Sequence, residues 1–151
     1  MIRDTLKAAQ VSAMKAGDKP RLAAVRLILA KIKDKDIELR TAASLPDDDV
    51  LVTDVLQKMA KQRRESITLY EQGDRQELAD IEKAELAVIE EFLPAQMGDD
   101  EVKAIITALI AETGAAGMKD MGKVVAALKA KHGTQLDMGK ASGLVKAALA
   151  G

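Results

Sequence analysis

The tetrapeptide Asp-Met-Gly-Lys occurs twice near the C-terminus, as Asp120–Lys123 and again as Asp137–Lys140. The copies lie 17 residues apart, and Lys129 and Lys146 follow them at equivalent places. Each copy reads as a helix start followed by a short basic helix. Free backbone N–H groups and the helix dipole make a helix N-terminus favourable for phosphate, and lysine adds positive charge. The repeat is therefore the first place in this chain where chemistry is predicted.

A structural interpretation of the repeat stays open beside the functional one. Asp is a good N-cap, since its carboxylate accepts a backbone N–H in the first turn, so the copies could simply mark two helix starts in one packing unit. Nucleotide binding is not expected. Gly117 to Lys123 has the spacing of a triphosphate-binding loop, but Val124 stands where Ser or Thr must hold magnesium, and no strand precedes it. No cofactor is predicted.

The charge distribution adds to the case for the repeat. The net charge is −1, which excludes a globally basic nucleic-acid binder. Residues 1–98 carry −2, residues 99–117 carry −3 and residues 118–151 carry +4, so the repeat lies in the only positive one of these sections. Its two glycines permit close approach of a partner backbone. The candidate contact residues are Lys119, Lys123, Lys140, Lys146, Gly122 and Gly139.

A second basic cluster in the middle of the chain has two interpretations. Its members are Lys58, Lys61, Arg63 and Arg64. They could grip an RNA backbone. However, acidic residues follow on the same predicted helix and on the next, and antiparallel packing would place them within reach: Glu65, Glu71, Glu82, Glu85, Glu90 and Glu91. An ion-paired helix face is favoured, because surface charge is normally solvated or paired.

Little else in the sequence suggests a reactive centre. His132, the single histidine, lies at a predicted helix end before Gly133, where a capping or solvent role is expected. No metal site can be assembled around it, and the serines lack an adjacent base that would activate them. Tyr70 and Phe92 are too few for a base-stacking platform, so any nucleic acid would be held through backbone charge and shape, which suits structured RNA.

Helical periodicity runs through nearly the whole chain and predicts an all-α fold. The core must consist of Ala, Leu, Ile, Val and Met, which favours helices over sheets. Apolar residues expected to face inward include Met14 and Ile81. The predicted helices cover about residues 2–16, 20–40, 47–72, 75–92 and 99–112, followed by two short ones starting at Asp120 and Asp137. A Pro, a Gly and a change of composition after residue 93 predict two domains: a larger one of about four helices over residues 1–93 and a small three-helix one over residues 94–151.

The composition also bears on location. Cys is absent, which excludes a disulfide framework and fits a cytoplasmic protein. The charged segment from Met1 to Lys7 does not read as a secretory signal. No apolar run approaches the roughly 20 residues that span a bilayer, so no membrane partner is predicted.

The middle of the chain resembles the YqeY-like family. The residues that carry the resemblance extend over the third and fourth predicted helices: Lys61-Gln-Arg-Arg-Glu-Ser66, Tyr70, Arg75, Leu78, Glu82, Glu85 and Phe92-Leu-Pro94. Asp34 to Arg40 and the Met-Gly-Lys tail are also similar to that family, so the resemblance covers essentially the whole chain. It implies two all-α domains.

The C-terminal part of that family is similar to the tail domain of GatB, a subunit of the tRNA-dependent amidotransferase that amidates misacylated tRNA. This similarity implies a link to tRNA. The positions that match the tail's motif are Met121, Gly122, Lys123, Asp137, Gly139, Lys140, Leu144 and Lys146. The chain departs from the enzyme in lacking a recognisable amidase, ATP site or ammonia route. It also has Gln135 in the loop where many relatives carry Arg.

Three functions are consistent with these observations. The leading one is a cytoplasmic accessory protein that binds tRNA or structured RNA without catalysing a reaction alone, with the amidotransferase or another translation-related protein as a possible partner. The second is a part in carbon–nitrogen ligation with glutamine as amide donor, which only the resemblance supports. The third is a protein-interaction adaptor that uses the wide apolar faces of the N-terminal helices.

Overall fold

The computed structural model describes residues 1–150, and this part of the chain contains helices and no strand. The all-α prediction is therefore confirmed. The chain divides into two compact units, Met1–Leu93 and Pro94–Gly151. The elements are α1 (Ile2–Ala16), α2 (Lys19–Glu38), η1 (Leu39–Thr41), α3 (Asp48–Gln72), α4 (Gln76–Phe92), α5 (Asp99–Thr113), η2 (Met118–Asp120), α6 (Met121–His132) and α7 (Met138–Ala150).

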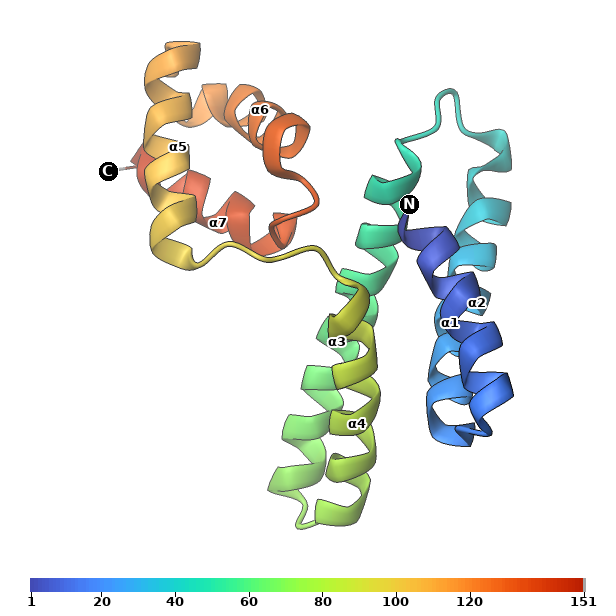
Figure 1. The fold of residues 1–151 in the computed structure, drawn as a ribbon. Helices are drawn as coiled ribbons and strands as arrows, with labels where there is room; N and C mark the ends of the chain where they lie inside the picture. The colour runs from blue at the N-terminus through green and yellow to red at the C-terminus, as the bar shows by residue number, and fades with distance from the viewer. Residues whose placement is uncertain (151) are drawn as a thin grey trace. The chain divides into compact units, whose positions relative to one another are not determined.

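Local sequence signals set most helix boundaries in the first unit. Gly17 ends α1 in the left-handed conformation, at φ 68°, where residues with a Cβ are strained. The Asp18 carboxylate then accepts the N–H of Arg21 at 3.2 Å and caps α2, and Pro20 occupies the first turn. These short punctuations turn the chain back on itself, so that α1 and α2 form one helical hairpin and α3 and α4 another (Figure 1).

One apolar core joins the two hairpins of the first unit. Its fully buried members come from α1, α2, α3 and α4, and they include Leu6, Val25, Ile28, Ile32, Val52, Leu56 and Ile89. The expectation that Met14 and Ile81 face inward is wrong, because their exposed fractions are 54% and 56%. Each helix here packs on one side only, so a narrow stripe is buried and the edge of the apolar face stays in solvent.

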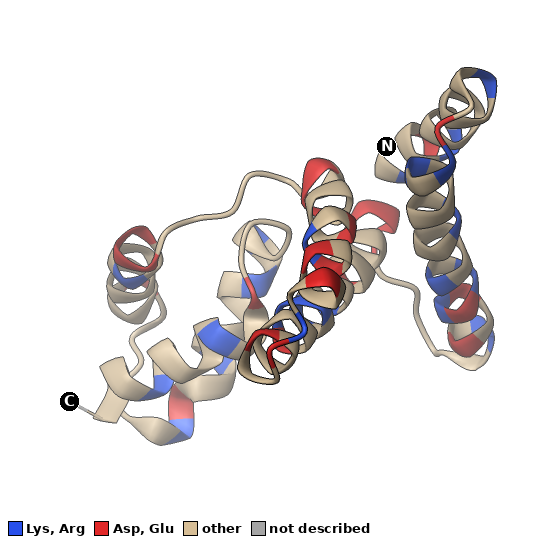
Figure 2. Ribbon diagram, turned by 90° about the horizontal axis from the view of Figure 1, so that it is seen from below, with Lys and Arg blue, Asp and Glu red and all other residues tan. Residues whose placement is uncertain are grey.

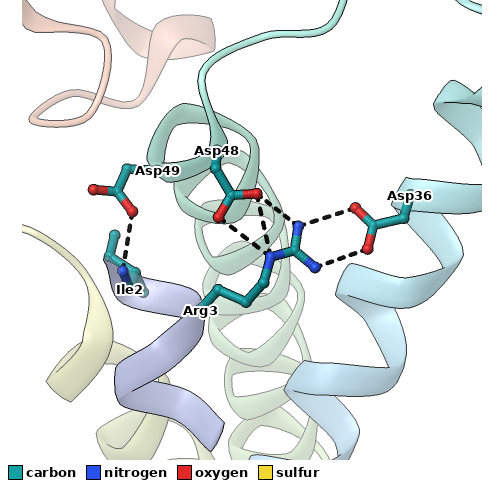
Figure 3. Close-up of polar contacts among 5 residues, drawn as sticks. All are labelled: Ile2, Arg3, Asp36, Asp48 and Asp49. Atoms are coloured by element: carbon teal, nitrogen blue, oxygen red, sulfur yellow. Dashed lines mark hydrogen bonds and ion pairs between the residues drawn. The ribbon is translucent and has the colours of Figure 1, made fainter.

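The side chain of Arg3 on α1 forms ion pairs with residues of α2 and α3 (Figure 3). Its Nη1 lies 2.8 Å from Asp36 on α2, and its Nη2 lies 2.8 Å from Asp48 on α3. Beside this fork, the Asp49 carboxylate accepts the backbone N–H of Ile2 at 3.0 Å, which satisfies a free donor at the start of α1. Acidic residues in the first turn of α3 thus hold the N-terminal end of α1.

The second unit is a three-helix arrangement of α5, α6 and α7 around its own core. Fully buried side chains come from all three helices and from the loop before α7, and they are Val102, Ile106, Leu109, Val124, Leu128, Leu136, Ala141 and Val145. The N–H of Met97 donates to the carbonyl of Gln135 at 2.9 Å, which ties the segment before α5 to that loop. This core positions both copies of the repeated tetrapeptide.

Candidate functional site

The first copy of the repeat is not a capped helix start. The carboxylate of Asp120 makes no capping bond to α6 and instead accepts the backbone N–H of Ala116 at 2.9 Å, in the preceding loop. That hydrogen bond, helped by the nearby charges of Lys123 and Lys119, lowers the pKa of Asp120. The N–H of Met121 bonds to the carbonyl of Met118, so α6 continues from η2. The capping role predicted for Asp120 is wrong, because this residue ends the one-turn helix η2 and its carboxylate bonds to the preceding loop instead of to α6.

The second copy is a capped helix start. Asp137 Oδ1 accepts the N–H of Gly139 at 2.9 Å and that of Lys140 at 3.4 Å, at the beginning of α7. A Cβ on Gly139 would lie 3.3 Å from the same carboxylate oxygen. The chain's own aspartate therefore occupies the N–H groups that would otherwise bind a phosphate, and the two copies differ in structure despite their identical sequences.

The four candidate lysines of the second unit are unequal. Lys140 Nζ lies 2.9 Å from Asp99 Oδ1, across the starts of α7 and α5. Lys123 Nζ lies 3.8 Å from Asp120 Oδ1, which is a long and weak pair. Lys119 and Lys146 are exposed and have no ion pair within the residues that the structure describes. Lys146 therefore has the least compensated charge of the four, whereas the charge of Lys119 acts on Asp120 without forming an ion pair.

Two helical glycines near these lysines have no role in the fold. A Cβ on Gly122 or Gly143 would meet no atom within 4 Å, and neither residue has a positive φ. A glycine inside a helix costs about 1 kcal/mol relative to alanine. Gly122 and Gly143 therefore leave bare, exposed backbone on α6 and α7 at a cost to stability that internal packing does not explain.

The basic cluster on α3 divides into paired and unpaired members. Arg63 Nη1 lies 3.2 Å from Glu82, and its Nε lies 3.1 Å from Glu85 without the alignment of a hydrogen bond. Arg64 Nη2 lies 3.0 Å from Glu90. The favoured interpretation, an ion-paired helix face, thus describes both arginines. Lys58 and Lys61 are exposed and have no ion pair in the described part of the chain.

The most positive part of the chain is the α1–α2 hairpin and not the C-terminal section. Residues 1–40 contain ten Lys and Arg but five Asp and Glu, which gives +5, whereas residues 41–93 contain six and thirteen, which gives −7. Figure 2 shows Asp and Glu concentrated on α3 and α4. The inference that the repeat lies in the only positive section is therefore wrong, because the charges of the two hairpins cancel when they are summed together.

The remaining candidate features are the single histidine, metal ligands and membrane-spanning helices. His132 Nδ1 lies 3.3 Å from Gln135 Oε1 at the end of α6, which is a contact between two side chains. Within residues 1–150 no group of three or more His, Cys, Asp or Glu residues could hold a metal ion. None of the helices described is long and apolar enough to cross a bilayer. What the geometry offers is charge segregated over two small helical units.

Comparison with known proteins places this arrangement in a family. The family model of Yqey-like proteins matches residues 3–149, so the chain belongs to the YqeY-like family. Among curated proteins it is similar to "Altered inheritance of mitochondria protein 41, mitochondrial" from three yeasts. The Eremothecium gossypii protein is 34% identical over 55% of this chain and 44% of its own length. The Vanderwaltozyma polyspora protein is 30% identical over 72% and 60%. The Candida glabrata protein is 33% identical over 59% and 48%. The matched part thus spans about half the length of these relatives.

Proposed function

We propose that the protein is a non-catalytic accessory factor that binds tRNA or another structured RNA through its second unit. The contacts would come from Lys119, Lys123, Lys140 and Lys146, with phosphate oxygens as their ligands. The observation that carries this proposal is that Lys119 and Lys146 are exposed and form no ion pair within the described residues, beside the bare backbone of α6 and α7. The resemblance of this part of the chain to the tRNA-contacting tail of GatB supports the same ligand.

The contact pattern suits phosphate recognition without base recognition. No aromatic side chain lies in residues 94–150, so there is no platform on which bases would stack. Lysine approaches phosphate as a point charge, and glycine lets a bulky backbone come close. Such a surface reads the shape and charge of an RNA helix. A cytoplasmic location, with the amidotransferase or another translation-related protein nearby, belongs to this proposal.

Salt dependence is the first signature to measure. Each lysine–phosphate contact releases condensed counterions, so four contacts give a slope of log K against log salt between about −2.8 and about −3.6, taking roughly 0.7 to 0.9 per contact. Asp99 and Asp120 compete with phosphate for Lys140 and Lys123. The slope is therefore expected at the shallow end of that range.

The test is a titration of unfractionated tRNA at low salt, followed by fluorescence anisotropy. Lys119→Glu with Lys146→Glu is expected to abolish measurable binding and flatten the salt slope by about two. Lys103→Glu, an equal charge change per site on the acidic helix α5, is the matched control and should bind nearly as the parent does. Binding that survives the double substitution, or falls equally with the control, would overturn the proposal.

A further inference from the structure

A groove runs between α1 and α2 and has an apolar floor with cations along its rim. It encloses about 500 Å³, with Val11, Leu29 and Ile32 on its floor and Lys7 and Lys33 beside them. Lys7 precedes Val11 by four residues on α1, and Lys33 follows Leu29 by four on α2, so on each helix the cation and the apolar residue share a face. The groove therefore offers an apolar pair next to a pair of positive charges.

The groove leaves apolar side chains of α1 exposed, because only a few residues of this helix are buried. The exposed fractions of Val11 and Met14, one turn apart on α1, are 50% and 54%. Only Leu6 and Ala13 of α1 are buried. Covering the groove would remove Val11 from water at about 25 cal/mol for each Å² of apolar surface buried. The apolar surface of α1 is thus incompletely used by the first unit itself.

The charge on the rim is unbalanced. Arg3 and Asp36 also line the groove, but they pair with each other at 2.8 Å. Lys7 and Lys33 have no ion pair within the described residues. An occupant with carboxylates beside apolar side chains would complement this surface, because desolvated cations need a partner.

The tip of the α3–α4 hairpin carries the opposite pattern. Leu69 on α3 and Ile81 on α4 are exposed, at 68% and 56%. Glu65 precedes Leu69 by four residues, and Glu77 precedes Ile81 by four, so each helix presents a carboxylate and an apolar residue on one face. Neither glutamate has an ion pair in the part of the chain that the structure describes. This tip belongs to the section with a net charge of −7.

We propose that the tip of the α3–α4 hairpin of one copy of this chain docks in the α1–α2 groove of a second copy. Leu69 and Ile81 would cover the apolar floor, and Glu65 and Glu77 would reach the rim lysines. Each surface draws on two helices that carry apolar and charged residues four apart, and the charges of the two surfaces are opposite. This inference does not depend on RNA binding by the second unit.

Protein is a better occupant of the groove than nucleic acid. A phosphate backbone gains nothing from an apolar floor, and no aromatic residue lines the groove to stack on a base. The contact is heterologous, since a tip meets a groove, and such contacts close into rings or continue as open chains of molecules. A contact made by two apolar and two charged side chains on each partner is small, so we expect its affinity to be weak and to fall further as salt is raised.

Sedimentation velocity of the full chain tests the proposal over a concentration series reaching about 1 mM, where small interfaces are populated. The parent is expected to associate at low salt and to dissociate as salt is raised. Val11→Glu with Lys33→Glu removes the groove, and Leu69→Lys with Ile81→Lys removes the tip. All four residues are exposed, so both variants should keep the parent's far-UV circular dichroism. Each variant alone is expected to be monomeric.

Mixing the two variants gives the decisive result. The groove variant keeps its tip and the tip variant keeps its groove, so an equimolar mixture should form a one-to-one heterodimer and nothing larger. Lys31→Glu, on the face of α2 towards α3, is the matched charge control and should associate like the parent. A parent that stays monomeric throughout, or variants that fail to pair, would overturn the proposal. If the groove variant also loses RNA binding, the occupant of the groove is nucleic acid, and this result would overturn the proposal as well.

Discussion

Replacing Arg3 should loosen the first unit more than any other single change of a charged residue on α1. The guanidinium links α1 to α2 through Asp36 and to α3 through Asp48 (Figure 3). The side chain is 22% exposed, and its two partners raise its pKa, with the hydrogen bond to Asp36 as the largest cause. Arg3→Met removes the fork and leaves the two carboxylates facing each other.

The magnitude follows from how enclosed each pair is. Asp36 also accepts hydrogen bonds from two guanidinium nitrogens, but it is 41% exposed, so we take about 0.5 kcal/mol for that pair, as for a solvent-screened ion pair. Asp48 is 28% exposed and accepts hydrogen bonds from two guanidinium nitrogens, which we take as about 1.5 kcal/mol. Arg3→Met should therefore destabilise the unit by about 2 kcal/mol. Arg3→Lys should retain about half of this, because an ammonium cannot hold two carboxylates in fork geometry.

The same network gives a pH dependence with a definite sign. Arg3 lowers the pKa of Asp36, chiefly through their hydrogen bond. A carboxyl whose folded pKa lies below its unfolded value stabilises the protein fully above the unfolded value, about 4 for Asp, and loses that contribution as pH falls towards the folded value. The difference in stability between the parent and Arg3→Met should thus be constant near pH 7 and shrink below about pH 4.

Tyrosine fluorescence in urea measures this directly, because Tyr70 is the single tyrosine, the chain has no tryptophan, and Tyr70 lies in the first unit. With an m-value of about 1–3 kcal/mol/M, a loss of about 2 kcal/mol moves the midpoint down by roughly 1 M. Lys15→Met is the control, since Lys15 is exposed on α1 and makes no ion pair within the described residues. An Arg3→Met midpoint that moves no further than the control, or a difference that grows below pH 4, would refute the reasoning.

Two further changes test the packing of each unit. Arg63→Met should cost about 1–3 kcal/mol in the same urea assay, because Glu82, only 16% exposed, loses its partner; Arg64→Met, which breaks an exposed pair, should stay within about 0.5 kcal/mol, and equal effects would contradict the assignment. In the second unit, Gly133→Ala should destabilise by about 1–3 kcal/mol, because its Cβ would lie 2.5 Å from a backbone carbonyl oxygen, whereas Gly143→Ala should stabilise by about 1 kcal/mol. Hydrogen exchange of residues 94–150 followed by mass spectrometry compares these two, and a Gly143→Ala chain that exchanges faster than the parent would contradict the view that this glycine is not needed by the fold.

The sequence was sufficient to predict the helices, for local reasons. Apolar residues with a period of 3.6 indicate a helix, whatever that helix packs against. This pattern is interrupted where the chain turns, at Gly17, Pro20, Gly73 and Pro94. The pairing of Arg63 with acids on α4 was also predictable, because two long helices joined by a short turn must run antiparallel. Both inferences need only neighbouring elements.

Features that depend on non-local packing could not be predicted in this way. The bond between Asp120 and Ala116 depends on a 3-10 turn that no propensity signals, so identical tetrapeptides gave one cap and one loop contact. The Arg3 fork joins residues 33 and 45 positions apart, and its partners follow only from the packing of three helices. The positive charge of the α1–α2 hairpin, by contrast, follows from the sequence alone. It is visible when charges are summed over residues 1–40 and hidden when they are summed over residues 1–98.

Segregated charge allows one chain with a net charge of −1 to carry the two anion-binding surfaces that we propose. Arg21 pairs with Glu91 at 2.7 Å, and Arg3 pairs with Asp48, so part of the opposite charge of the two hairpins is used in joining them. Charges further apart than the Debye length, about 8 Å at physiological salt, act almost independently. Lys7 and Lys33 in the first unit, and Lys119 and Lys146 in the second, have no ion pair within the described residues, so each pair adds positive charge to its own unit. In the two proposals, different neighbours of the lysines would select the anion: apolar side chains at the groove, and bare helical backbone in the second unit.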